Sequence, residues 1–547
     1  MNKENLTAYE VVTEENLTDI HSTGWLLRHK KTGARVMLIE NDDENKVFNI
    51  AFRTPPKDST GVAHILEHSV LCGSREFPLK DPFVELVKGS LNTFLNAMTY
   101  PDKTCYPVAS CNDKDFQNLM HVYLDAVFYP NIYKREEIFR QEGWNYHLEQ
   151  KEGPLKYNGV VYNEMKGAFS SPDEVLEREI MNHLFPDTTY GCESGGDPKN
   201  IPDLTYENFL NFHRTYYHPS NSYIYLYGNM DMEEKLAFLD EHYLSHFDYL
   251  DVDSVIQEQK AFGACRDVTL EYPVAENEGE EDNTYLSYNM VVGNAADSQM
   301  AMAFEVLDYA LLSAPGAPLK QALLDVKAGK DVYGSYDDGI LQPYFTVIAK
   351  GSNPDRKEEF VSVIRQVLGD IVKNGIDRKA VEAGINYFEF RYREADFSSY
   401  PKGLMYSLDI LGDWLYEKGN PFAQVQQLTV FEKLKKAVNE GYFEELIRKY
   451  LLENPHGCIM TLIPKKGLAA QREKELEEKL EAYRSSLSEE QLDAMVEKTK
   501  ALEAYQEAGE DPKALECIPM LKRSDIKREA AKIINEELTV DDSLFLY

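Results

Sequence analysis

The sequence predicts an α+β protein with two related domains, each a mostly antiparallel sheet packed with helices, followed by a helical hairpin. Strand-like and helix-like segments follow the same order before and after an acidic stretch without periodicity at 249–260. The segment from 465 to about 507 is rich in Glu, Lys, Ala and Leu, as solvated helices are. We therefore divide the chain into α+β domains at 1–255 and 256–464 and a linker at 465–547.

The composition of the 547-residue chain limits its partners. A formal charge of −35 argues against nucleic acid and anionic membranes. Seven scattered cysteines without a C-x-x-C pair indicate a reducing compartment. The first residues contain no apolar targeting segment, and no apolar run approaches the length of a membrane span. We therefore expect a cytoplasmic protein that binds neither nucleic acid nor membrane.

The first domain contains one helix around which the functional prediction is built. Residues 46–53 (KVFNIAFR) place three aromatic or aliphatic side chains on one face, as a half-buried strand does. A Thr-Pro-Pro turn follows, and then the segment 59–74 (STGVAHILEHSVLCGS) has an apolar stripe at helical spacing. Asp58, Ser59 and Thr60 are candidate N-cap residues, and Gly73 can adopt the left-handed conformation at the C-terminal end.

The remaining elements are predicted from caps and periodicity. We expect a short helix from Asp81 to Gly89, a strand pair around the turn 100–102, helices within 115–128, 134–144 and 158–169, a helix capped by Ser171, a strand at 222–228 and a helix at 232–247. The second domain repeats the order with strands at 283–293, 344–350 and 457–464 and a helix at 298–313. This order favours a duplicated domain over coincidence, and the second copy of the helix has no histidine.

The end of the chain forms the predicted linker. The hairpin breaks at Ser485-Ser486, and Ser488 with Gln491 can cap its second helix. Residues 543–547 (SLFLY) resemble the beginning of a strand after an acidic turn at 541–542. We expect the chain to continue into a further domain in the complete protein.

The helix at 59–74 carries the pattern H-x-x-E-H. His64 and His68 are four residues apart and therefore lie on one face of a helix, where both imidazoles can bind one metal ion. Glu67 lies beside them and can take a proton from water activated by that metal. The alternative is chance spacing of ordinary histidines. His242 and His246 are also four apart but lack a similar acid, and we interpret them as the solvated end of a helix.

Six segments in order resemble the pitrilysin-type zinc metallopeptidases with an inverted motif, and most closely the presequence protease branch. They are GVAHILEHSVLCGS from Gly61, LNAMTYPDKTCYPVAS from Leu95, QEGW from Gln141, GVVYNEMKGAF from Gly159, SGGDP from Ser194 and HPSN from His218. Together they span much of the first 230 residues. The resemblance implies a zinc metalloendopeptidase with one Zn²⁺ bound per chain.

The resemblance also assigns roles to residues that spacing could not select. It implies that Glu164 is the third zinc ligand, although alone it reads as an exposed helix acid, and that Glu67 is the general base. Asn96 and Ala97 match the edge strand that holds peptides by strand addition, while a turn role for Asn96 is equally compatible with the sequence. Glu142 either orients a ligand histidine or forms a surface salt bridge.

Complete members of this family close two halves around a chamber, and this chain corresponds to one half with the linker. The resemblance implies short, unfolded peptides as substrates and a C-terminal half, in cis or in trans, as partner. An Arg/Tyr pair of the family has no equivalent here. The second hypothesis is therefore a non-catalytic or obligate half-enzyme that binds peptides and needs a second half. A non-hydrolytic metal site is the weakest alternative, because Glu67 would then have no chemical role.

Overall fold

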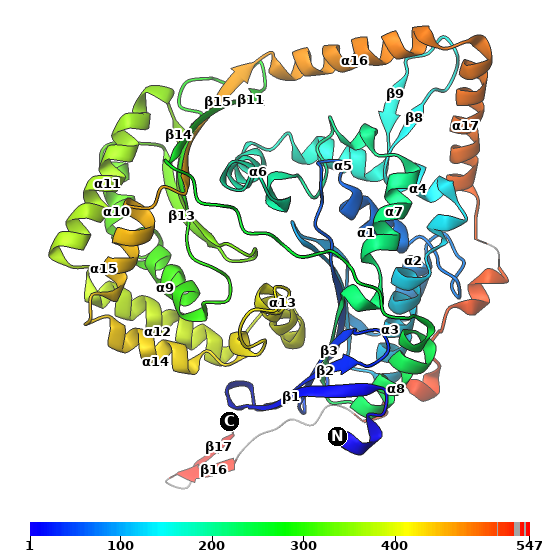
Figure 1. Cartoon of the computed structure of the whole chain (residues 1–547), viewed down its shortest axis with the longest axis horizontal. Helices are drawn as coiled ribbons and strands as arrows, with labels where there is room; N and C mark the ends of the chain where they lie inside the picture. Colours follow the sequence, from blue (N-terminus) through cyan, green and yellow to red (C-terminus); the bar gives the residue numbers. More distant parts are fainter. Residues whose placement is uncertain (511, 530–536, 541–542, 547) are drawn as a thin grey trace.

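The computed structural model describes residues 1–510, 512–529, 537–540 and 543–546 (Figure 1). Its first sheet has the strand order β1-β2-β3-β10-β4-β7-β5, with β6 paired to β7 beside β5. These strands are β1 Tyr9–Leu17, β2 Ser22–His29, β3 Arg35–Glu40, β4 Lys46–Arg53, β5 Asn92–Leu95, β6 Met98–Thr99, β7 Lys103–Ser110 and β10 Ser222–Gly228. The predicted strand pair around the turn 100–102 is therefore confirmed as β6 and β7.

The second sheet repeats the first. Its order is β11-β15-β12-β14-β13, from β11 Arg266–Val274, β12 Thr284–Val291, β13 Asp331–Asp337, β14 Tyr344–Ser352 and β15 Gly457–Lys466. One pair is parallel in each sheet, β3 with β10 and β11 with β15, and the equivalent neighbours are antiparallel in both. Two sheets with the same chain order, spatial order and strand directions support duplication rather than coincidence.

Helices cover the sheets of both units. In the first unit they are α1 Val62–Val70, α2 Pro82–Val87, α3 Asp113–Phe128, α4 Glu136–Glu142, α5 Val160–Ala168, α6 Pro172–Leu184, α7 Tyr206–Tyr216 and α8 Met232–His242, with a small hairpin of β8 Asn145–His147 and β9 Lys156–Asn158. In the second unit they are α9 Ser298–Asp308, α10 Pro318–Asp325, α11 Lys357–Asn374, α12 Arg378–Glu394, α13 Lys402–Trp414, α14 Leu428–Ala437 and α15 Tyr442–Leu446. Every helix among the described residues is too short or too polar to cross a lipid bilayer.

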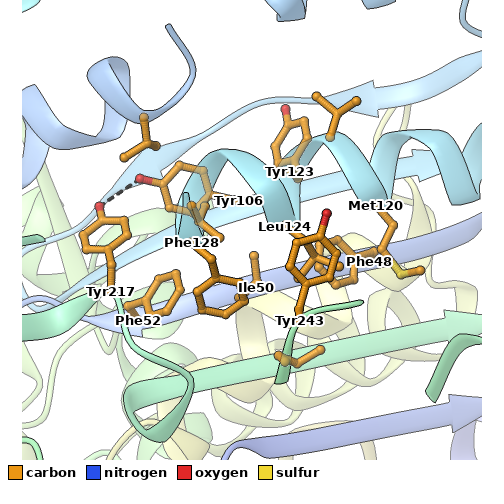
Figure 2. Packing of buried hydrophobic residues seen from close by; sticks show 14 of the residues in the cluster. Phe48, Ile50, Phe52, Tyr106, Met120, Tyr123, Leu124, Phe128, Tyr217 and Tyr243 are labelled. Atoms are coloured by element: carbon orange, nitrogen blue, oxygen red, sulfur yellow. Dashed lines mark hydrogen bonds between the residues drawn. The ribbon is translucent and has the colours of Figure 1, made fainter. Parts of the chain in front are cut away.

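The core of the first unit is aromatic. Phe48, Ile50 and Phe52 of β4 lie in one buried cluster with Phe128 of α3, whose ring stands edge-on to that of Phe52 with ring centroids 6.0 Å apart (Figure 2). Within it the hydroxyl groups of Tyr106 and Tyr217 are hydrogen-bonded at 2.8 Å. This packing fixes the sheet against the helices that carry the predicted site.

Each sheet is covered on its other face by a helix from the other unit. Helix α13 packs on β4 and β10 of the first sheet, while α6 packs on β12 and β15 of the second, and both lie between the two sheets in Figure 1. The prediction that β4 is half-buried was therefore wrong: all eight of its residues are buried. A helix from more than 300 residues away covers the face that the local pattern assigned to solvent.

The linker forms the two predicted helices along the outside of the molecule, but they meet at a corner and do not run side by side, so the prediction of a hairpin was wrong (Figure 1). Helix α16 spans Leu468–Ser486 and α17 spans Glu489–Glu507, and Ser488 and Gln491 form the expected capping box. Tyr483 stacks on Tyr146 of β8, with ring centroids 4.9 Å apart. Strand β17, Ser543–Leu546, pairs with β16, Glu537–Val540, and confirms the predicted strand, whereas the predicted acidic turn at 541–542 lies outside the described residues.

Candidate metal centre

Helix α1 begins differently from the prediction. Its N-cap is Gly61, in the left-handed conformation with φ +69°, and no side chain caps the helix. The Asp58 carboxylate instead accepts hydrogen bonds from the backbone and hydroxyl of Thr60, and the Ser59 hydroxyl accepts one from the backbone N–H of Glu193. Of the predicted cap residues, Ser59 therefore attaches a distant loop, while Asp58 and Thr60 bond to each other.

The attached loop, 193–197, packs against the start of α1. A Cβ atom added to Gly61 would lie 2.7 Å from both the carbonyl oxygen of Gly195 and the Cα of Gly196. The backbone N–H of Asp197 also donates to the carbonyl of Ser59 at 2.9 Å. Only glycine satisfies both the positive φ and this close approach. The paired glycines of the SGGDP segment thus place the Gly195 carbonyl beside the first histidine.

His64, His68 and Glu164 come together at one point. The Nε2 atoms of His64 and His68 each lie 3.8 Å from Oε2 of Glu164, which reaches them from α5. Among the residues that the structure describes, these three form the one group of His, Cys, Asp or Glu side chains whose ligand atoms all lie within 4.8 Å of one another. The structure therefore brings a residue about 100 positions downstream to the pair that the spacing predicts.

The Nδ1 atoms of both histidines are engaged away from this point. His64 Nδ1 lies 3.0 Å from the Gly195 carbonyl oxygen, and His68 Nδ1 lies 3.3 Å from Oε2 of Glu142. Because both partners are acceptors, each imidazole donates from Nδ1, and Nε2 is the nitrogen that the neutral ring leaves free to bind a cation. Two such nitrogens and one carboxylate oxygen are a donor set that suits a tetrahedral cation with an open fourth position.

Glu142 is buried at the end of α4, which packs against α1. Its Oε1 accepts a hydrogen bond from the side chain of Gln141 at 2.7 Å and one from the Cys72 thiol at 3.6 Å. Burial alone would raise the pKa of Glu142, but the hydrogen bonds from His68 and Gln141 outweigh it and lower the pKa. Glu142 therefore stays ionised beneath His68. Its burial excludes the alternative of a surface salt bridge.

Close backbone contact places α5 beside α4. A Cβ atom on Gly159, which precedes α5 and has φ +153°, would lie 2.2 Å from the carbonyl oxygen of Gly143. The strands that follow α4 and precede α5 pair with each other, from Asn145 opposite Asn158. This crossing holds Glu164, whose side chain is half-exposed, over the histidines of α1.

Glu67 lies on the same helix, directly before His68 in the chain. It is buried with 9% of its surface exposed, on the side of α1 that faces β6 and β7. Burial raises the pKa of Tyr123 well above its usual value, and the nearby charge of Glu67 raises it further. A carboxylate next to His68 and turned toward the free edge of the sheet can accept a proton from a molecule bound between that edge and the histidines.

Asn96 and Ala97 lie between β5 and β6, at the edge of the first sheet. The Asn96 backbone N–H donates to the Pro107 carbonyl at 3.3 Å, and its carbonyl accepts from the Tyr123 hydroxyl at 3.2 Å. The Asn96 side chain is exposed. Among the described strands, β5 and β6 pair only with β7, so their outer side is a free edge beside α1.

Other sequence signals lie outside this site. His242 ends α8 and both it and His246 are exposed, which agrees with the interpretation as a helix end. In the second unit α9 follows β12 as α1 follows β4, and α9 contains neither histidine nor cysteine. The second copy of the helix therefore lacks both nitrogen ligands.

Comparison with known proteins supports this architecture. Residues 52–190 match the insulinase family (peptidase family M16), residues 203–388 match the peptidase M16 inactive domain, and residues 462–546 match the associated domain of subfamily C of the same peptidase family. "Protein HypA" of Clostridium perfringens is 51% identical over 98% of this chain and 55% of that protein. "Presequence protease 1, chloroplastic/mitochondrial" of Arabidopsis thaliana is 42% identical over 96% of this chain and 49% of that protein.

Solved structures share the fold at low sequence identity. A protease from Helicobacter pylori superposes with a TM-score of 0.61 at 16% identity, over 83% of this chain and 99% of that one. Pitrilysin superposes with a TM-score of 0.59 at 15% identity, over 84% of this chain and 47% of its own. The chain spans about half the length of the curated relatives it matches. It belongs to the M16 family of peptidases, and presequence proteases are among its relatives.

Proposed function

We propose that this chain is the catalytic half of a zinc metalloendopeptidase that cuts short, unfolded peptides in the cytoplasm. The observation that carries the proposal is the convergence of the Nε2 atoms of two histidines and a carboxylate, with a second carboxylate on the same helix and a free strand edge next to that helix. The family relationship to peptidases supports the same activity.

In this proposal His64, His68 and Glu164 hold Zn²⁺. Bound there, zinc would supply a Lewis acid that activates water and polarises the scissile carbonyl. Glu142 and the Gly195 carbonyl keep the histidines in the tautomer that leaves Nε2 free. A site with three protein ligands and one open position is typical of catalytic rather than structural zinc.

Glu67 is the proposed general base. Its carboxylate takes a proton from water and passes it to the leaving amine of the cut peptide. Asn96 and Ala97 lie on the edge that would hold the substrate, because an extended peptide can add to a free edge through backbone hydrogen bonds. Main-chain pairing accepts many sequences, which suits a peptidase for unfolded peptides. We expect neither nucleic acid nor membrane among its ligands.

The test compares Glu67→Gln with Glu164→Gln. Glu67→Gln should lower peptide cleavage by about 10²–10⁴-fold, as the loss of a general base does, while one zinc per chain remains bound. Glu164→Gln should lower zinc content as well as cleavage. Metal analysis of the purified variants and a quenched-fluorescence peptide assay measure both. Loss of zinc from the Glu67→Gln variant would show that Glu67 is a ligand and contradict the assignment.

A second proposal is that this chain is an obligate half-enzyme. It is favoured by the share of the relatives' length that the chain covers, 55% and 49% for the two named above. Cleavage is measured with this chain alone and after mixing with a chain that carries the C-terminal half of such a relative. Activity only in the mixture supports an obligate half, whereas equal activity in both samples contradicts it.

A further inference from the structure

The turn between β6 and β7 contains a carboxylate that is fully buried. Asp102 has 0% of its surface exposed. Its Oδ2 accepts hydrogen bonds from the hydroxyl groups of Tyr190 and Tyr416, both at 2.6 Å. Its Oδ1 lies 3.3 Å from the ammonium group of Lys103. The carboxylate is therefore satisfied by one cation and two phenols, in a place where water does not reach it.

The groups around Asp102 come from both units. Tyr190 follows α6 in the first unit, whereas Tyr416 follows α13 in the second. The Tyr190 hydroxyl also accepts a hydrogen bond from the backbone N–H of Leu341 at 2.9 Å, and Lys103 donates to the Gly339 carbonyl at 3.0 Å. The turn of the first sheet is thus tied to α13 and to the 339–341 loop of the second unit.

The same turn ends the free edge of the first sheet. Its hydrogen bond runs from the Tyr100 N–H to the Lys103 carbonyl, 2.8 Å away, and the Asp102 carbonyl accepts from the Thr54 N–H at 2.9 Å. Strand β6 precedes the turn directly, pairs with β7, and packs against α1, the helix of His64 and His68. A displacement of the turn therefore displaces the edge relative to the candidate ligands.

The hydrogen bonds of this cluster keep their direction over a wide pH range. Burial, and then the charge of Asp102, raise the pKa values of Tyr190 and Tyr416 well above normal, so both phenols remain donors. A buried network of this kind adds little to the free energy of folding, because desolvation offsets much of the electrostatic gain. Its main effect is to hold the turn in one defined geometry.

We propose that Asp102 is a positioning residue for the peptide-binding edge, and that the metal-free second unit takes part in the reaction by holding that edge through Tyr416 and the 339–341 loop. The effect on peptide binding rests on the proposed peptidase function, whereas the effect of Asp102 on the position of β6 does not. Asp102 acts through the position of β6 and does not itself touch the substrate.

The first experiment tests the geometry without a substrate. Hydrogen exchange of the segment 92–101 is compared in the wild type, Asp102→Asn, Tyr416→Phe and Tyr223→Phe. Tyr223 is a matched control because its buried hydroxyl donates to the Leu415 carbonyl at 3.0 Å, at the same end of α13, without touching the turn. Asp102→Asn and Tyr416→Phe should speed exchange about tenfold, because the loss of one hydrogen bond makes local opening of this segment easier. Unchanged exchange in both, or an equal change in Tyr223→Phe, overturns the proposal.

The second experiment tests the consequence in the Glu67→Gln background, where bound peptide persists. Tyr416→Phe should weaken binding of a labelled, unfolded peptide of about 12 residues by about fivefold or more, since that peptide pairs with the edge. Zinc content and the affinity for acetohydroxamate, whose binding needs only the metal, should stay unchanged. Equal weakening by Tyr223→Phe would show a general effect of interface stability. A parent chain that binds zinc but no peptide contradicts the proposed function, while the exchange experiment still decides the role of Asp102.

Discussion

Burial decides what the acidic residue Glu142 can do. In the sequence it is one of 93 acids, on a helix that is otherwise charged, and a surface ion pair explains it as well as any other role. In the structure it is 7% exposed and lies under His68 with its charge retained. A buried carboxylate on the Nδ1 side of a metal-binding imidazole makes that imidazole a better electron donor.

Glu142→Gln is therefore expected to weaken zinc binding by about 10-fold or more, within the range that outer partners of metal ligands contribute. The amide retains the size of the side chain and an acceptor for His68 but loses the charge. Competition with a chromophoric chelator measures the affinity. Glu136→Gln, at an exposed position at the start of the same helix, is the control. Equal affinities in the two variants would contradict the role of Glu142.

The residues of the site differ in how far sequence could find them. His64 and His68 follow from helical spacing, a local rule. Glu164 follows only from the family resemblance, because its neighbours in the chain carry no sign of a metal 100 residues away. The Gly195 carbonyl was missed, since every residue has a backbone carbonyl. The pair of glycines beside it was the available signal, because two adjacent glycines indicate a close backbone approach.

At the scale of one element, the start of α1 depends on a contact that its own segment does not contain. The local sequence offers three good cap residues, and the structure uses none of them as the cap. Gly61 takes the position because loop 193–197 lies against it, and the Ser59 side chain binds that loop. The contact between Gly61 and loop 193–197 therefore overrides the local preference for a polar N-cap. The same contact holds the Gly195 carbonyl, the acceptor for His64, in place.

Gly61→Ala should destabilise the fold and weaken zinc binding together. A left-handed conformation costs a residue with a Cβ about 1–2 kcal/mol, and the clash with the loop adds to this. Thermal unfolding and zinc competition measure the two effects.

Gly167→Ala is the matched control for this variant, because nothing lies within 4 Å of a Cβ added at Gly167, the last residue but one of α5. It should stabilise the protein by up to about 1 kcal/mol, since alanine loses less backbone entropy than glycine on folding. If Gly61→Ala behaved like this control, the contact with loop 193–197 would not constrain α1.

At the scale of the whole molecule, acidic side chains gather in the second unit, where the counterpart of the metal site lies. Burial and the charges of Asp338 and Asp308 raise the pKa of Glu305 to about 8, from 4.5. Burial raises the pKa of Asp413 of α13 to about 7, from 3.8, although Gln424 hydrogen-bonds to it. Both pKa values are higher in the folded protein than in the unfolded chain. At a pH between the unfolded-state and folded-state pKa of each group, the folded protein therefore binds more protons than the unfolded chain.

The folded protein should therefore lose stability as the pH rises. The contribution of these two groups is fully present below their unfolded-state pKa values and is lost as the pH passes through about 7 and 8. Glu305→Gln should reduce the fall in melting temperature between about pH 6 and pH 8.5, because a neutral amide does not release that proton. Glu382→Gln, at an exposed position on α12, should leave the fall unchanged. An unaltered pH dependence in Glu305→Gln would contradict the assignment.

The sequence by itself determined the order of elements, the repeated units, the two linker helices and the two histidines with Glu67. These depend on periodicity, caps and helical spacing, which act between residues a few positions apart. Only the tertiary structure decided which helix covers which sheet, that β4 is buried on both faces, where α1 begins, and that Asp102 joins the turn at the free edge of the first sheet to the second unit. These features depend on contacts between segments hundreds of residues apart, whose energies no local pattern records.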